Sequence, residues 1–132
     1  NDAQFLYDML KERDSTVNVE HTKLPTYKKH VDFIKSNPYD GWYIILADSV
    51  KLGHIFVDSE NRIGWFVKKE YKGFGFVIQA FDELKKLHKR EKYIGKINPK
   101  NIDAQNLIVK LNFLLKETYS KYLLYEYNNT KK

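Results

Sequence analysis

The sequence predicts an α/β (α+β) protein in which a mixed, mostly antiparallel sheet is flanked by about four helices. Two segments with helical periodicity come first, and three β-rich runs then follow one another through short turns. After these, the spacing of the apolar residues predicts a helix, a strand and a second helix, and a final pair of strands ends the sequence. An antiparallel meander followed by strand–helix–strand units requires both kinds of pairing in one sheet. The 132 residues fit one core, so we expect 1–132 to form a single domain.

The helices follow from the spacing of apolar residues. Phe5, Leu6, Met9 and Leu10 form a stripe on the first helix, which Asn1 or Asp2 can cap. The second begins at Thr26 and ends before Pro38, because proline disfavours the helical conformation in the residue that precedes it. The expected helices are 3–11, 26–36, 76 to about 89, and 104–111.

The strands are β-rich runs separated by turn residues. Asp48-Ser49 and the segment 58–61 supply the turns of the meander. Residues 14–24 show no periodicity and are expected to form a loop. The expected strands are 42–47, 51–57, 63–67, 93–97, 113–118 and 122–127.

The composition excludes several function classes. The chain has no cysteine, which rules out disulfides, thiolate metal sites and a cysteine nucleophile and suits a reducing cytoplasm. No apolar run approaches the ~20 residues needed to cross a bilayer, so no membrane partner is expected. The four histidines show no metal-ligand spacing, and no metal is predicted. We expect core or boundary packing for His30, His54 and His88, and core packing for Trp42 and Trp65.

The formal net charge of +6 suggests an anionic partner. The basic residues are spread along the chain without an arginine-rich block or a nucleic-acid motif, which disfavours nucleic acid. A solvated lysine-rich surface explains the charge equally well, and a polyanionic cofactor would also satisfy it.

One stretch of the sequence points to chemistry. Residues 63–77 form a predicted strand that runs through Gly73 and Gly75 directly into an amphipathic helix. Glycine tolerates a positive φ and lets a ligand approach the backbone closely. The first amides of a helix lack partners and lie at the positive end of its dipole, a place that binds phosphate. A tightly packed helix start explains the glycines as well, and the pattern matches neither the Walker loop nor the dinucleotide fingerprint.

A second stretch follows the fourth predicted strand. Asn101 precedes a helix and is a favoured N-cap. Asn112 follows the same helix and suits a left-handed C-cap. Each asparagine is accounted for by its structural role, so the combination with the upstream turn carries the functional signal.

Together the two stretches resemble the GNAT superfamily of acyl-CoA-dependent N-acyltransferases. Residues 70–75 correspond to its strand–turn–helix motif, commonly Q/R-x-x-G-x-G/A, with Glu70 in the first position. Residues 101–113 correspond to its N-x-x-A-x-x-L-x-x-K-L-G-F segment, with Asn112 in place of the glycine. The resemblance implies the acyl-CoA N-acyltransferase fold, with acetyl-CoA as cosubstrate. The family's first strand would precede Asn1 and is missing from this sequence.

The resemblance also implies roles for individual residues. The backbone at Val67 would bind pantetheine and polarise the thioester carbonyl, and Asn101 would contact the pantetheine arm. The pyrophosphate would be held by the turn and helix start, namely Lys72, Gly73, Phe74, Gly75, Phe76 and Val77.

Catalytic groups are less clearly marked. Ile108 occupies the position where many members carry a tyrosine that acts as the acid. Glu60, just before a strand, is the candidate base, although a solvated turn glutamate explains it too. Tyr119 and Tyr122 are candidate acids, although tyrosine at the end of a sheet is commonly a packing residue.

The acceptor prediction rests on the segment before the sheet. Residues 14–27 are polar, and 28–33 resemble the helix of members that acetylate amino groups on nucleotide-linked sugars. We therefore predict an amino-sugar nucleotide as the small-molecule amine acceptor. The alternatives are a protein N-terminus or another amine, or a catalytically degenerate basic binding module. The oligomeric state is open, with a homodimer among the options.

Overall fold

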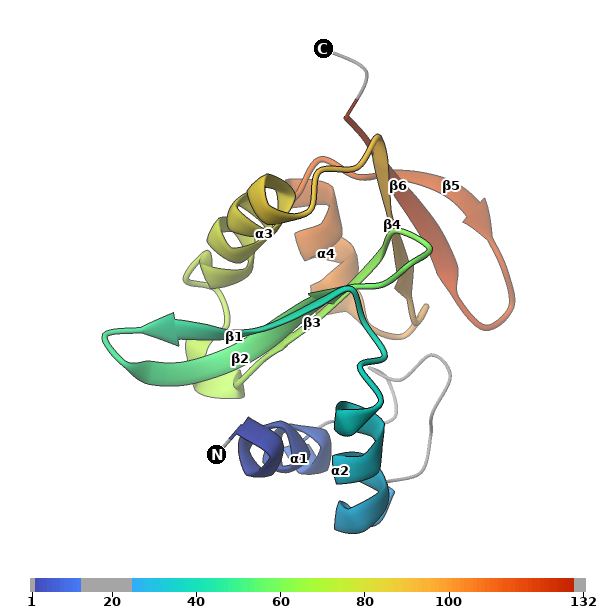
Figure 1. Ribbon diagram of the computed structural model, residues 1–132. Coiled ribbons are helices and arrows are strands. Elements are labelled where there is room, and N and C mark those ends of the chain that lie inside the picture. The colour runs from blue at the N-terminus through green and yellow to red at the C-terminus, as the bar shows by residue number, and fades with distance from the viewer. Residues whose placement is uncertain (1, 13–24, 130–132) are drawn as a thin grey trace.

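The computed structural model describes residues 2–12 and 25–129, and its centre is a six-stranded sheet in the order β1-β2-β3-β4-β6-β5 (Figure 1). β3 and β4 pair in parallel, and the other neighbouring strands pair antiparallel. The predicted mixed, mostly antiparallel sheet is therefore confirmed. The strands are β1 Gly41–Ala47, β2 Val50–Val57, β3 Arg62–Val67, β4 Lys92–Ile97, β5 Leu114–Thr118 and β6 Leu123–Asn128.

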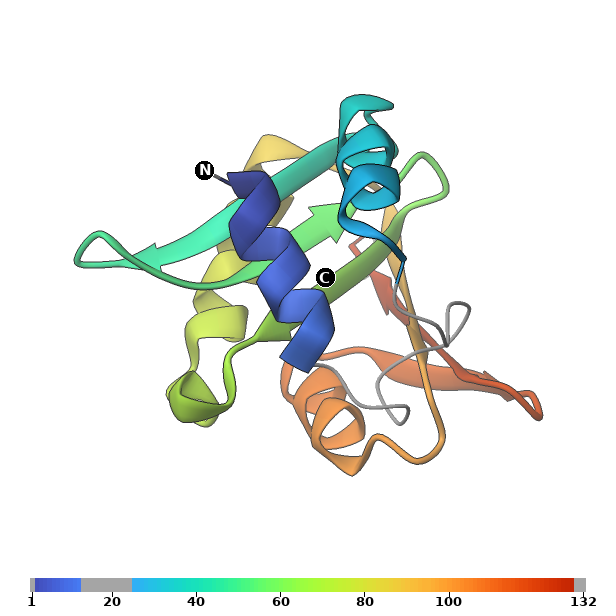
Figure 2. The same ribbon diagram turned by 90° about the horizontal axis from the view of Figure 1, so that it is seen from below.

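Within the described residues, four α-helices flank this sheet in two layers. α1 and α2 cover one face, and α3 and α4 cover the other (Figures 1 and 2). A short 3-10 helix, η1 (Lys69–Tyr71), joins β3 to the glycine turn before α3. The helices are α1 Asp2–Glu12, α2 Tyr27–Lys35, α3 Phe76–Leu87 and α4 Ile102–Lys110. The predicted cap at Asn1 and the predicted loop 14–24 lie outside the described residues.

Local signals in the sequence set the ends of these elements. The Thr26 hydroxyl accepts a hydrogen bond from the Lys29 amide, 3.2 Å away, and begins α2. The Asn101 side chain does the same for the Ala104 amide at 3.1 Å. Asn112 has φ 71°, as expected for a left-handed residue after a helix. Asp48 and Ser49 both have positive φ, the requirement of a tight hairpin turn between β1 and β2.

The main core lies between the sheet and the α3/α4 layer. Phe81 of α3 contacts Tyr93 of β4 and Phe113, with ring centroids 5.4 Å away in each case. Tyr93 is fully buried, and its hydroxyl donates to the His88 carbonyl at 2.6 Å. On the opposite face, Leu6 and Met9 of α1 are buried. The two apolar layers hold the sheet between them and bring α1 and α2 over the strands that form the site.

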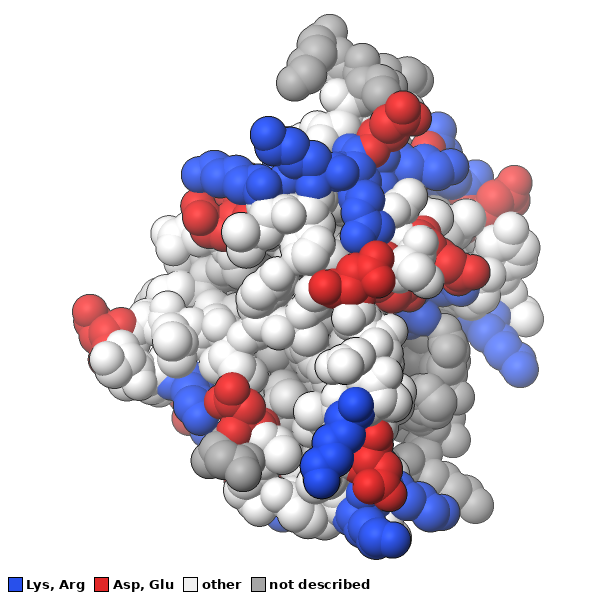
Figure 3. Space-filling model, viewed as in Figure 1, with Lys and Arg blue, Asp and Glu red and all other residues white. Residues whose placement is uncertain are grey.

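The positive charge of the surface is interleaved with negative charge. Figure 3 shows basic side chains in a row over the end of α3 and the loop to β4, with acidic side chains beside them. Lys86 lies 3.0 Å from Glu83, and Arg90 lies 2.9 Å from Asp40. This face therefore presents mixed charge.

None of the helices formed by the described residues has the length and apolar character that a membrane crossing requires.

Candidate acetyl-CoA site

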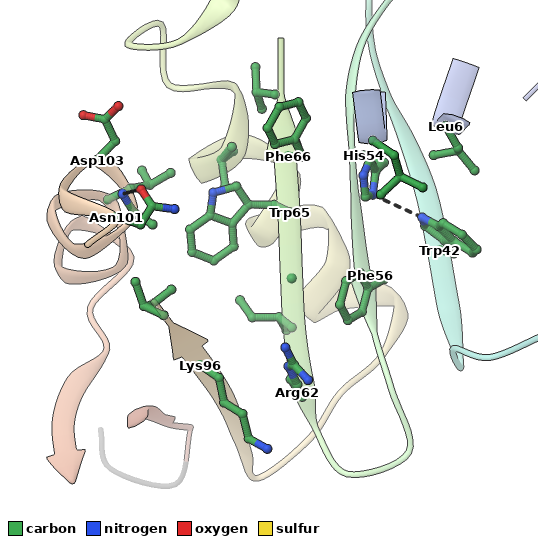
Figure 4. Close-up of a pocket in the computed structure, with 18 of the residues that line it drawn as sticks. Leu6, Trp42, His54, Phe56, Arg62, Trp65, Phe66, Lys96, Asn101 and Asp103 are labelled. Carbon is green, nitrogen blue, oxygen red and sulfur yellow. Dashed lines mark hydrogen bonds between the residues drawn. The ribbon is translucent and has the colours of Figure 1, made fainter. Parts of the chain in front are cut away.

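The site forms where two neighbouring strands separate. β3 and β4 are paired at Arg62–Ile94 and Ile63–Gly95, and the strands then diverge (Figure 4). A cleft of about 1330 Å³ follows this divergence. One end reaches the start of α3, and the other lies under α1 and α2. Trp65 projects from β3 toward α4, where Asn101 lies (Figure 4).

The glycine turn at the first end leaves backbone open to a ligand. Gly73 and Gly75 have φ of 87° and 81°, a left-handed conformation that side chains disfavour. A Cβ built at either glycine would have nothing within 4 Å. α3 starts directly after Gly75, which provides no side-chain cap for the first amides of the helix.

This geometry fits a pyrophosphate. The first amides of α3 lie at the positive end of the helix dipole, where phosphate groups bind. The Lys72 ammonium lies beside the turn, 3.9 Å from the Asp103 carboxylate on α4. Both side chains are substantially exposed, so this weak ion pair leaves the lysine able to reach a ligand.

The cleft brings together seven of the eight residues predicted to bind the cofactor. The exception is Phe74, which is 66% exposed and is not part of the lining. The seven come from β3, the turn, α3 and the start of α4, and they are Val67, Lys72, Gly73, Gly75, Phe76, Val77 and Asn101.

The two predicted catalytic residues lie elsewhere on the surface. Glu60 is exposed in the β2–β3 turn, where its amide donates to the Asp58 carboxylate at 2.9 Å. Tyr119 is 46% exposed in the β5–β6 turn, with its ring 4.9 Å from that of Tyr122. Neither is among the described residues that line the cleft. Their catalytic roles stay predictions.

Ile108, at the position of the family's usual acid, is fully buried in the α4 face of the core. Gly95 of β4 makes room for it, because a Cβ there would lie 2.9 Å from the Ile108 Cδ1 atom.

The end of the cleft under α1 and α2 contains residues that sequence reasoning did not select for function. Trp42 is half-buried and lines this end, so its prediction as a core residue is wrong. Trp65, which lines the cleft on the side of α4, also packs against the core, so its prediction is incomplete. The Trp42 indole donates to Nδ1 of His54 at 3.2 Å (Figure 4). This bond assigns Nδ1 as the acceptor, so neutral His54 carries its proton on Nε2.

A second imidazole lines the same end. His30 of α2 is only 5% exposed, and its Nε2 atom makes no hydrogen bond within the described part of the chain. Burial lowers the pKa of His30, because the charged form loses solvation. The prediction of core or boundary packing is confirmed for His30 and His54, and both also face the cleft. Residues 2–12 and 25–129 contain no group of histidine and acidic residues arranged to hold a metal ion.

Solved structures with the same architecture decide the fold. A domain from Methanocaldococcus jannaschii matches with a TM-score of 0.78 at 17% identity, over 97% of this chain and 92% of that one. Spermidine N-acetyltransferase from Vibrio cholerae, in complex with CoA and spermine, gives 0.77 at 13% identity, over 98% and 91%. The microcin C7 self-immunity acetyltransferase MccE, in complex with acetyl-CoA and AMP, gives 0.72 at 15% identity, over 96% and 86%.

The chain has the acyl-CoA N-acyltransferase fold. The predicted fold class is thereby confirmed. No family model matches the sequence, and no curated protein sequence matches it. At these identities the likeness establishes the fold, and the activity has to be argued from the site.

Proposed function

We propose that this protein transfers the acetyl group of acetyl-CoA to a primary amine. The observation that carries the proposal is the continuous cleft from the open glycine turn, along the divergence of β3 and β4, to the pocket under α1 and α2. Such a path can accept a phosphate group, an extended arm and an acceptor in that order. The similar structures support it, since one contains CoA with spermine and another contains acetyl-CoA.

In this proposal the backbone does most of the cofactor binding. The amides from Lys72 to Val77 hold the pyrophosphate, and the edge of β3 up to Val67 binds the pantetheine arm, with Asn101 opposite. The Val67 backbone polarises the thioester carbonyl.

The reaction is direct attack in a ternary complex. The amine nitrogen bonds to the acyl carbon, and the carbon–sulfur bond breaks as the thiolate leaves. The proton that the amine gives up ends on the departing sulfur, so the products are the amide and the free thiol of CoA. A thioester is already activated, so the protein contributes chiefly by positioning the two reactants and excluding water. A thiol with pKa of about 8.5 leaves with little help from an acid.

The finer prediction of an amino-sugar nucleotide as acceptor belongs to this proposal. Two segments support it. Residues 28–33 lie on α2, whereas the part of 14–27 that precedes Pro25 lies outside the described residues. The rival acceptors are a protein N-terminus and a polyamine, and a catalytically degenerate binding module is the rival function.

The test measures binding and transfer together. Acetyl-CoA should raise the melting temperature of the protein, and thiol release should accompany acetylation of at least one member of a panel of amino-sugar nucleotides, aminoglycosides, polyamines and short peptides. Gly75→Val, which blocks the proposed pyrophosphate site, should lose both the stabilisation by acetyl-CoA and the thiol release. A protein that gains no stability from acetyl-CoA and acetylates no amine would refute the proposal.

A further inference from the structure

Four aromatic side chains line the end of the cleft under α1 and α2. Tyr39 lies flat on Phe56, with ring centroids 3.9 Å apart and an interplanar angle of 11°. The rings of Trp42 and of Phe33 on α2 lie nearly perpendicular to the Tyr39 ring, at 4.8 and 5.9 Å from it. All four side chains line the cleft and are at least partly exposed. We call Phe33, Tyr39, Trp42 and Phe56 the aromatic wall.

The sheet places the aromatic wall beside the path proposed for the cofactor. Trp42 pairs with Phe56 across β1 and β2, and Phe56 pairs with Gly64 across β2 and β3, so the three share one face. The ring of Phe56 lies over Gly64, because a Cβ there would overlap it. The pairing of β3 with β4 ends at Ile63, one residue before Gly64. The Phe56 ring therefore lies where the two strands begin to diverge.

Aliphatic side chains also line this end of the cleft. Leu6 and Leu10 come from α1, and Pro25 and Pro38 come from the segments just before and just after α2. A concave site lined by aromatic and aliphatic side chains is typical of a pocket for a small organic molecule. Burying an apolar group there removes both surfaces from water, which favours binding.

The orientation of the rings favours a flat ligand over an aliphatic one. Tyr39 and Phe56 share one plane direction, and Trp42 and Phe33 are turned from the Tyr39 ring by 84° and 80°. A ligand ring parallel to one of these planes is edge-on to the other, and aromatic pairs prefer both arrangements. A saturated ring or an alkyl chain gains apolar burial here and neither of these ring contacts. An ammonium group also binds to ring faces, so a polyamine is the rival ligand.

We propose that the acceptor amine is carried by a molecule with a planar ring, and that this ring binds against the aromatic wall. This inference rests on the proposed acetyl transfer and specifies its substrate class. The transfer itself is unchanged: the amine nitrogen bonds to the acyl carbon, the carbon–sulfur bond breaks, and the proton of the amine ends on the sulfur. The two sources of such a ring are a phenyl group and a nucleobase, the second being present in an amino-sugar nucleotide.

The test compares four amines at saturating acetyl-CoA: phenethylamine, 2-cyclohexylethylamine, n-butylamine and spermidine. The first two have the same carbon skeleton and charge and differ in the planarity of the ring. Phenethylamine should have a kcat/KM about threefold to tenfold above that of 2-cyclohexylethylamine. It should exceed n-butylamine, which lacks a ring, by about tenfold or more. In a parallel arm, 9-(2-aminoethyl)adenine replaces phenethylamine, and the better of these two acceptors identifies the source of the ring.

Variants of the aromatic wall test the contact itself. Phe56→Leu keeps an apolar side chain and removes the ring, so the preference for the planar ring over 2-cyclohexylethylamine should fall about threefold or more. Phe33→Leu should act in the same direction, and because Phe33 is 43% exposed, this variant should fold. The matched control is Phe5→Leu on α1, a half-buried phenylalanine outside the cleft lining, which should keep the preference of the wild type.

Failures of the two proposals are distinguishable. Acetyl transfer that favours spermidine, or that uses 2-cyclohexylethylamine as well as both planar acceptors, overturns the substrate class and leaves acetyl transfer standing. A protein that does not bind acetyl-CoA overturns the proposed function itself. NMR gives a readout without turnover, because the better planar amine, added to the protein with CoA, should shift the indole N–H signal of Trp42, assigned with Trp42→Phe. An unchanged signal overturns the substrate class.

Discussion

Replacing Gly75 with valine tests only the proposed pyrophosphate site, which is formed by the glycine turn and the first amides of α3. The residue has φ 81°, and the space around its missing Cβ is open. No overlap with the protein is therefore introduced, and the structural cost is the left-handed conformation itself, about 1–2 kcal/mol for a residue with a side chain. The protein should remain folded, with its melting temperature lower by a few degrees.

The loss of acetyl-CoA affinity should exceed what the fold loses. A valine side chain occupies the open space through which a pyrophosphate reaches the amides of α3. Each hydrogen bond to a charged group contributes about 1.5–3 kcal/mol, so losing one weakens binding about 10- to 100-fold. Lys72→Ala removes only an exposed charge that contributes about 0.2–1 kcal/mol, which corresponds to less than about tenfold.

Ser49→Val is the matched control for backbone strain. Ser49 has φ 68° and lies exposed in the β1–β2 turn, outside the cleft lining. It should cost similar stability and leave acetyl-CoA affinity unchanged in isothermal calorimetry. If Gly75→Val bound acetyl-CoA as tightly as the wild type, or lost no more affinity than Lys72→Ala, the assignment of the pyrophosphate to this turn would be wrong.

Three other outcomes follow from the structure. Tyr119→Phe and Tyr122→Phe should each lower kcat by a few-fold at most, since both rings lie outside the cleft lining; abolished turnover with intact acetyl-CoA binding would contradict this. Burial holds the pKa of His30 below its usual value near 6.5, so the folded state binds fewer protons than the unfolded state as the pH falls through that region. Chemical denaturation should therefore show stability dropping from pH 7 toward pH 5, with a shallower drop in His30→Gln; parallel pH profiles would exclude the histidine. Phe81→Ala should destabilise the fold by about 3–5 kcal/mol, whereas Leu87→Ala on the exposed side of α3 should stay within about 0.5 kcal/mol; equal effects would place the core elsewhere.

The elements of this fold are predictable because their boundaries are encoded locally. Thr26 and Asn101 cap helices through their own side chains, and Gly73 and Gly75 adopt the positive φ that the turn before α3 requires. These signals depend on neighbours a few residues away. The elements, and the residues that line the cleft near the glycine turn, could therefore be predicted, apart from Phe74, whose position in the motif does not reveal that it lies outside the lining.

The end of the cleft under α1 and α2 depends on contacts between distant parts of the sequence. Tyr39 lies between α2 and β1 and stacks on Phe56 of β2. This contact depends on the register in which β1 and β2 pair and on the position of α2 over that face of the sheet. Periodicity identified Trp42 as an apolar strand residue but not which layer would cover it. The strand order β4-β6-β5 could not be predicted from the sequence either, because either strand of a hairpin can pair with the edge of a sheet.

The most direct test of the account follows the backbone amides by NMR while CoA is added. The account predicts the largest chemical-shift changes at the amides of Gly73, Gly75, Phe76 and Val77, with further changes at Val67 and Asn101. The loop 88–91 at the other end of α3, which carries Lys89 and Arg90, should not respond. Binding with the largest changes in that loop, or no binding at all, would contradict the claim that this cleft is an acetyl-CoA site.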